Sequence, residues 1–225
     1  MPLLNAYSIS GNTITEDVQI TNGHLLVYPI IAVWKITESI EELCQLLPNG
    51  KNDLDIVQQK FKSEVRQKEW LAVRILCHSL LSEPFEIQYQ ESGKPYLKGT
   101  NLHISISHTK GYAALALSKP PIGIDIETWS SKAMKLKSKF LQESEMQLYL
   151  TNKPEDDAVV LWSAKESVYK IQEHQSPNLK DDILLFQKEP FLCAKSNREN
   201  QIAQILFYTH PDFVLTSATY YPIEI

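Results

Sequence analysis

The hydrophobic pattern changes period several times along this chain of 225 residues. Alternating or continuous apolar runs predict strands at residues 25–36, 85–89, 102–107, 112–117, 123–127, 184–186, 191–194, 202–208 and 213–220. Apolar residues spaced three and four apart predict helices at 39–47, 55–81, 132–150 and 158–172. Because helices and strands interleave without a regular strand–helix–strand rhythm, the sequence predicts an α+β fold.

Prolines suggest how these elements are divided. Pro29 falls inside the first predicted strand, and its missing N–H favours an edge position or a bulge there. Lys119-Pro120-Pro121 interrupts the pattern near the midpoint of the chain. We therefore expect two lobes of similar size, an N-terminal lobe at 1–118 and a C-terminal lobe at 119–225, with residues 1–24 unassigned.

Composition excludes several classes of protein. The chain is 43% hydrophobic with a net charge of −5, which is typical of a globular protein and unfavourable for non-specific nucleic-acid binding. Its cysteines, Cys44, Cys77 and Cys193, are odd in number and far apart, so they predict no disulfide framework or zinc site. The N-terminus lacks a signal-peptide pattern, and the longest apolar run, 24–34, is too short for a membrane span. We expect a cytoplasmic protein.

Two acids interrupt an apolar strand in the stretch PIGIDIETW. Asp125 and Glu127 project to one side of the strand, while Ile124 and Ile126 project to the other side and can be buried. One interpretation is a half-buried strand with a solvated acidic face. The other is a divalent cation site, because Mg²⁺ binds one or two carboxylates together with water and phosphate oxygens. The strand alone favours neither.

Three further features have both an ordinary and a chemical interpretation. Trp162, Glu166 and Lys170 share one face of a predicted helix; Glu166 and Lys170 form either a surface pair or a third acid with a phosphate-binding cation. Ser107 and His108 lie at the end of a predicted strand, where they either form an ordinary turn or bind a phosphate. Arg74 interrupts an apolar helical stretch, and its head reaches either water or an anion.

The order of these motifs resembles the 4′-phosphopantetheinyl transferase superfamily, specifically its two-lobed, monomeric surfactin-type branch. Gly-Ile-Asp-Ile-Glu at 123–127 and Trp-Ser-Ala-Lys-Glu-Ser-Val-Tyr-Lys at 162–170 match the family's two core motifs. Gly-Lys-Pro at 93–95 and Trp-Leu-Ala-Val-Arg at 70–74 support the match, which spans roughly 60–170. The resemblance differs in two places: Ser105 stands where the family often has Asn, and no Gly-x-Gly follows Lys170.

The resemblance implies a fold and a reaction. The fold is a pseudo-dimer of two α+β lobes with the active site in the cleft between them. The reaction transfers the 4′-phosphopantetheine arm of coenzyme A to a serine of an acyl or peptidyl carrier protein and releases 3′,5′-ADP. The carrier could serve fatty-acid, polyketide or non-ribosomal peptide synthesis.

The resemblance also assigns roles to residues. It implies Mg²⁺ ligands at Asp125, Glu127 and Glu166, a general base at Glu166, and a leaving-phosphate contact at Lys170. The implied coenzyme-binding residues are Arg74, Lys94, Ser107 and His108. Lys165 is given no role.

Two questions stay open from the sequence. The lysines after the metal strand form either a docking site for an acidic carrier or a solvated helix face: Lys132, Lys135, Lys137 and Lys139. Two rival functions also fit the same acids, an Mg²⁺-dependent hydrolase of nucleotides or pyrophosphate and a degenerate protein that binds a carrier or coenzyme A without catalysis.

Overall fold

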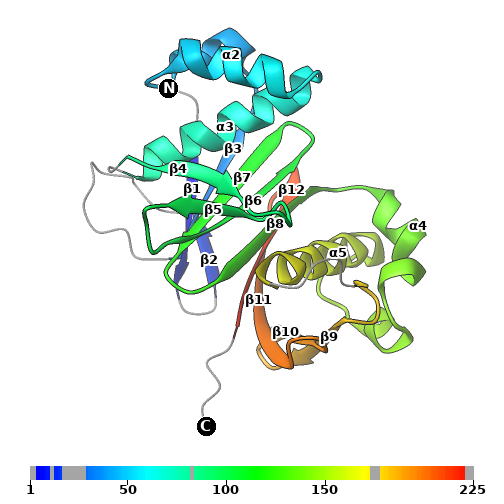
Figure 1. The fold of residues 1–225 in the computed structure, drawn as a ribbon. Helices are drawn as coiled ribbons and strands as arrows, with labels where there is room; N and C mark the ends of the chain where they lie inside the picture. Colours follow the sequence, from blue (N-terminus) through cyan, green and yellow to red (C-terminus); the bar gives the residue numbers. More distant parts are fainter. Residues whose placement is uncertain (1–3, 11–12, 17–28, 82–83, 173–177, 221–225) are drawn as a thin grey trace.

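Two five-stranded sheets and a small hairpin make up the β structure of the computed structural model (Figure 1), which describes residues 4–10, 13–16, 29–81, 84–172 and 178–220. The first sheet has the strand order β2 (Thr13–Glu16), β1 (Leu4–Ser10), β3 (Ile30–Lys35), β7 (Tyr112–Ser118), β6 (His103–Thr109). The second has the order β8 (Ile122–Thr128), β12 (Phe213–Tyr220), β11 (Gln201–Thr209), β10 (Phe191–Ser196), β9 (Ile183–Lys188). The hairpin pairs β4 (Glu86–Tyr89) with β5 (Pro95–Lys98). The expected mixed fold of helices and strands is confirmed.

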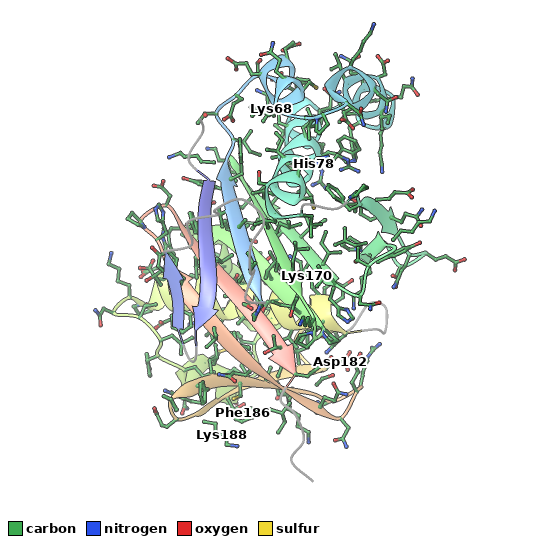
Figure 2. The ribbon with its side chains drawn as sticks, turned by 90° about the vertical axis from the view of Figure 1, so that its left-hand side faces the viewer. Lys68, His78, Lys170, Asp182, Phe186 and Lys188 are labelled. Atoms are coloured by element: carbon green, nitrogen blue, oxygen red, sulfur yellow. The ribbon has the colours of Figure 1, made fainter. Side chains whose placement is uncertain are left out.

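Each large sheet packs against helices. The helix α3 (Glu64–Leu80) packs against the first sheet, and α1 (Ile40–Gln45) and α2 (Gly50–Lys60) pack against α3 (Figure 1). The second packs against α5 (Pro154–Ile171) and the 3₁₀ helix η1 (Glu143–Gln147), and α4 (Ser131–Phe140) packs against α5. Figure 2 shows Lys68 and His78 on α3 at one end of the molecule, Phe186 and Lys188 near the other, and Lys170 between them.

A third apolar cluster lies between the two sheets. Ile124 and Ile126 of β8 are fully buried there, against Ile31 and Val33 of β3. Since side chains alternate along a strand, this arrangement turns Asp125 and Glu127 toward the opposite face of β8, where α5 packs. The predicted division of β8 into an apolar and an acidic face is confirmed.

The predicted helix at 55–81 is wrong as a single element. Phe61 has extended backbone angles (φ −131°, ψ 131°) and ends α2, and α3 begins after Ser63. The spacing of Val57, Phe61 and Val65 suggested one continuous stripe, but Val65 is 61% exposed whereas Val57 is fully buried. The apolar repeat therefore crosses a real break between two helices.

Other boundaries also differ from the expectation. The predicted helix at 132–150 divides into α4 and η1, because Leu141 and Gln142 are extended. Pro29 precedes β3, which lies between β1 and β7, so the predicted edge position or bulge is wrong; residues 25–28 lie outside the described part. The sequence patterns did not predict β1, β2 or β5. The last four predicted strands are confirmed as β9 to β12.

Candidate active site

The acidic face of β8 lies directly against α5. A Cβ atom at Gly123 would be 1.9 Å from the Ser167 carbonyl oxygen, so only glycine permits this close approach of strand and helix. The approach places Asp125 and Glu127 within reach of side chains from α5. The motif glycine thus determines how near the strand's acids come to the helix.

Trp162, Glu166 and Lys170 share the side of α5 that faces these acids. Trp162 donates its indole N–H to Glu127 Oε1 at 3.1 Å. Lys170 Nζ donates to Asp125 Oδ1 at 2.8 Å, the Ile124 carbonyl at 2.9 Å and Ser107 Oγ at 2.9 Å. Lys170 therefore donates hydrogen bonds to both β8 and β6. The interpretation of Glu166 and Lys170 as a simple surface pair is wrong.

The acids perturb one another's protonation. Burial, together with the charges of Asp125 and Glu127 and against the effect of Lys170, raises the pKa of Glu166 to about 7. Burial, together with Asp125, also raises the pKa of Glu127. A carboxyl group with a pKa near 7 can accept a proton efficiently at neutral pH. Glu166 therefore has the protonation behaviour that a general base at neutral pH requires.

One buried oxygen of this cluster has no partner among the described residues. Asp125 is 5% exposed, and its Oδ2 accepts no hydrogen bond from them, although Oδ1 accepts from both Lys170 and Ser107. Among the described residues, no three His, Cys, Asp or Glu side chains stand together as a ready-made metal site. The donor set is nonetheless all carboxylate oxygen, which suits Mg²⁺, and the orphaned Oδ2 offers it one ligand.

His108 and Arg74 line a hollow of about 460 Å³ between α3, β6 and the β4–β5 hairpin. Arg66 lies against the His108 ring and donates to Glu69 at 2.9 Å. Burial lowers the pKa of His108, and Arg66 and Lys170 lower it further, against the raising effect of Glu69. Arg66 and Glu69 were missed in the sequence, although their three-residue spacing on a helix was visible.

Arg74 has a partly buried head on the wall of this hollow. Its guanidinium stacks on the Trp70 ring, and Nη1 donates to the Trp70 carbonyl at 3.2 Å. Burial lowers the pKa of Arg74 to about 10, so the group stays charged at neutral pH. The hollow therefore combines an apolar wall with two guanidinium groups and an imidazole, which suits an anionic ligand with a flat ring.

Ser107 and Lys94 are placed differently from the other predicted coenzyme contacts. The Ser107 hydroxyl donates to Asp125 Oδ1 at 2.8 Å. Lys94 Nζ donates to the carbonyls of Ile171 and Gln172 at 3.1 and 3.3 Å, at the C-terminal end of α5. A cation there complements the helix dipole. The structure gives both residues a protein partner, and their contact with a ligand stays a prediction.

Lys165 is buried on another side of α5. Its Nζ lies 2.8 Å from Glu145 Oε1 and donates to the carbonyls of Leu179 and Ile183 at 2.9 and 2.7 Å. Burial lowers the pKa of Lys165, and the bond to Glu145 opposes this. The sequence did not point to Glu145, because an acid between two polar stretches looks like a surface residue.

The four candidate docking lysines all lie on α4, which packs beside α5. Lys132, Lys135 and Lys139 are exposed, and their spacing places them on one face of the helix, whereas Lys137 is half-buried.

None of the described helices is both long and apolar enough to cross a bilayer.

Comparisons with known proteins agree with the motifs. Residues 121–216 match the family model of the 4′-phosphopantetheinyl transferase superfamily. The chain is 33% identical over 129 residues to the 4′-phosphopantetheinyl transferase gsp of Aneurinibacillus migulanus, covering 50% of this chain and 53% of that protein. It is 29% identical over 141 residues to a 4′-phosphopantetheinyl transferase of Bacillus subtilis, covering 55% of this chain and 63% of the relative.

A further relative is the 4′-phosphopantetheinyl transferase Sfp of Bacillus subtilis strain 168, 28% identical over 107 residues. That match covers 43% of this chain and 48% of Sfp. The chain thus spans about half to three fifths of the relatives it matches. The resemblance seen in the motifs is confirmed by these matches.

Proposed function

We propose that this chain is a member of the 4′-phosphopantetheinyl transferase superfamily and transfers the phosphopantetheine arm of coenzyme A to a serine of an acyl or peptidyl carrier protein. The observation that carries this proposal is the acid cluster of β8 and α5, beside the cationic hollow of α3 and β6. In this cluster, the Glu166 carboxyl has a pKa of about 7, and the buried Asp125 Oδ2 has no hydrogen-bond partner among the described residues. Lys170 contacts both β8 and β6. These are the groups that phosphoryl-type transfer to a hydroxyl requires.

We infer that the chain is a pseudo-dimer of lobes 1–118 and 119–225, with coenzyme A in the cleft between them. In support, each half contains one five-stranded antiparallel sheet covered by a long helix, α3 or α5. The proposed coenzyme residues Arg74 and His108 come from the first half, and Glu166 and Lys170 come from the second. Arg66 adds a second guanidinium for the coenzyme's phosphates.

The residues act on the substrates in a defined order. Glu166 accepts the proton of the carrier's serine hydroxyl, which otherwise is a weak nucleophile. The serine oxygen then forms a bond to the phosphorus that bears the pantetheine arm, and the bond from that phosphorus to the bridging oxygen breaks. The electron pair leaves with 3′,5′-ADP, whose phosphate Lys170 stabilises by its charge.

Asp125, Glu127 and Glu166 would hold Mg²⁺ in this reaction. The ion supplies positive charge that offsets the charge of the coenzyme's pyrophosphate. Lys170 already neutralises Asp125 Oδ1, while Trp162 orients Glu127. The protein thus holds two of the three carboxylates in place through its own hydrogen bonds.

An intact-mass assay tests the proposed function. The protein is incubated with coenzyme A, Mg²⁺ and an apo-carrier, and transfer adds one phosphopantetheine group of ~340 Da to the carrier. A hydrolase would split coenzyme A without any carrier, and a degenerate binder would retain coenzyme A without a mass gain. Transfer that persists in both Asp125→Ala and Glu166→Ala would refute the site.

We also propose that the exposed lysines of α4 dock an acidic carrier, since α4 lies beside the helix that carries Glu166. Replacing Lys132, Lys135 and Lys139 by Glu should raise the KM for the carrier roughly tenfold or more, because like charges then meet at the contact. The affinity for coenzyme A should stay unchanged. The charge reversal Lys195→Glu, at an exposed position of β10, is the control. An unchanged carrier KM in the triple variant would remove α4 from the docking surface.

A further inference from the structure

A row of three hydroxyls joins the edges of the two large sheets. β6 and β8 belong to different sheets but lie side by side. Ser105 Oγ accepts the backbone N–H of Ile124 at 3.0 Å, Ser107 Oγ that of Ile126 at 3.3 Å, and Thr109 Oγ1 that of Thr128 at 3.4 Å. This hydroxyl row (Ser105, Ser107, Thr109) provides acceptors for amides at the edge of the second sheet.

The row has a constant register against β8. Each backbone amide lies 19 residues after the residue whose hydroxyl accepts its hydrogen bond. The residue 18 positions after each hydroxyl residue faces α5. For Ser107 that residue is Asp125, which accepts from the hydroxyl at 2.8 Å, and for Thr109 it is Glu127, at 3.3 Å. For Ser105 the equivalent residue is Gly123, which has no side chain.

We infer that Thr109 is a positioning residue for Glu127, and that the hydroxyl row lets the first half of the chain orient acids contributed by the second. This inference rests on the proposed function, since it concerns the carboxylates offered to the metal. Glu127 is held at both oxygens, by Trp162 of α5 on Oε1 and by Thr109 of β6 on Oε2. The terminal torsion of a glutamate is otherwise broad, so two donors on different elements fix its plane.

Thr109 is the member of the row that isolates this effect. Ser107 also contacts Lys170, so its loss would disturb the acid and the cation together. Among the described residues, the Thr109 hydroxyl binds one acid of the site, Glu127, and valine can replace this threonine at nearly equal volume. Ser105 accepts a comparable amide but faces no acid, so it provides a matched control within the same row.

The test compares Mn²⁺ affinity, measured by electron paramagnetic resonance, with thermal stability in four proteins. Thr109→Val should weaken Mn²⁺ binding by about tenfold, the usual cost of losing a group that orients a metal ligand. Thr109→Ser retains the hydroxyl and should bind within about twofold of the unmodified protein. Ser105→Ala should lower Tm about as much as Thr109→Val does, because each leaves one amide without its acceptor, but should leave Mn²⁺ affinity unchanged.

Three results would overturn the inference. Thr109→Val could bind Mn²⁺ as tightly as the unmodified protein, or Ser105→Ala could weaken binding as much as Thr109→Val does. An unmodified protein that binds no Mn²⁺ would overturn the metal site and the inference together. Normal Mn²⁺ binding without any mass gain on a carrier would refute the proposed function alone, so the two failures are distinguishable.

Discussion

Lys165 and Glu166 are neighbours on α5, yet the networks they join differ in how fully their polar atoms are paired. Lys165 Nζ is surrounded by the Glu145 carboxylate and two carbonyls, and Glu145 also accepts the backbone N–H of Leu185 at 2.8 Å. On the other side of the helix, Asp125 Oδ2 has no hydrogen-bond partner in the part of the chain that the structure describes, and Glu166 has a pKa of about 7. A network completed by protein atoms stabilises the fold, whereas spare buried oxygens indicate room for a ligand.

The largest effect on stability should come from breaking the completed network. Glu145→Gln leaves the buried Lys165 ammonium without its counter-charge and should cost about 3–5 kcal/mol of unfolding free energy. Urea denaturation measures the loss, and Glu143→Gln, at an exposed position two residues away, is the control. The double variant Lys165→Met/Glu145→Leu should recover much of the loss, since it removes both charges. A single Glu145→Gln as stable as the control would mean that the pair does not hold η1 and α5 together.

The next effect concerns the ligand-facing network. Lys170→Met removes the cation that contacts Asp125 and Ser107 and that we propose for the leaving phosphate, so transfer should slow by about 10²–10³. Single-turnover rates with saturating coenzyme A and carrier measure the chemical step. A rate within threefold of the unmodified protein would exclude Lys170 from the reaction.

A smaller effect is expected at Gly123, where β8 packs against the helix that carries Lys165 and Glu166. Gly123→Ala places a Cβ against the Ser167 carbonyl, a backbone atom that moves only if α5 moves. Overpacking of this kind should cost about 1–3 kcal/mol and should lower transfer as well, because Glu166 and Lys170 shift with the helix. Urea denaturation and the intact-mass assay measure the two losses. Normal stability would show that the strand and helix can separate without cost.

The smallest effect is a pH dependence that belongs to the ligand-facing side alone. Folding raises the pKa of Glu166 from 4.5 to about 7, so the folded protein holds this proton more tightly than the unfolded chain. The resulting stability is present below pH 4.5 and is lost as pH rises through 7. After allowance for partial exposure the loss is on the order of 1–2 kcal/mol. Urea denaturation in EDTA should give a lower unfolding free energy at pH 8 than at pH 5.5, and Glu166→Gln should reduce this difference. The same difference in both proteins would contradict the assignment of the pH dependence to Glu166.

The sequence predicted which side chains share a face better than where the helices end. Strand and helix periodicity placed Asp125 with Glu127 and Glu166 with Lys170, whatever the exact ends of the elements are, and their roles stay predictions. The break at Phe61 was missed, because the apolar spacing of Val57, Phe61 and Val65 is identical in one helix and across two. Only packing reveals that Val65 is exposed.

Contacts between distant segments could not be predicted from the sequence either. Glu145 meets Lys165 across 20 residues, and the hydroxyls of β6 meet β8 across 18 or 19. No local pattern records such a register, since it depends on how two sheets pack edge to edge. Lys94 shows the same limit: no local pattern predicts that its Nζ donates to carbonyls at the end of α5, and its contact with phosphate stays a prediction.

The most direct measurement compares the two networks in the transfer reaction itself. Carrier modification is followed by intact mass for the unmodified protein, for Glu166→Gln and for Lys165→Met/Glu145→Leu, at a temperature where all three are folded. The account predicts a ~340 Da gain with the unmodified protein, a loss of rate of about 10³ in Glu166→Gln, and a rate within about tenfold of the unmodified protein in the double variant. No transfer by the unmodified protein, or equal losses in both variants, would contradict it.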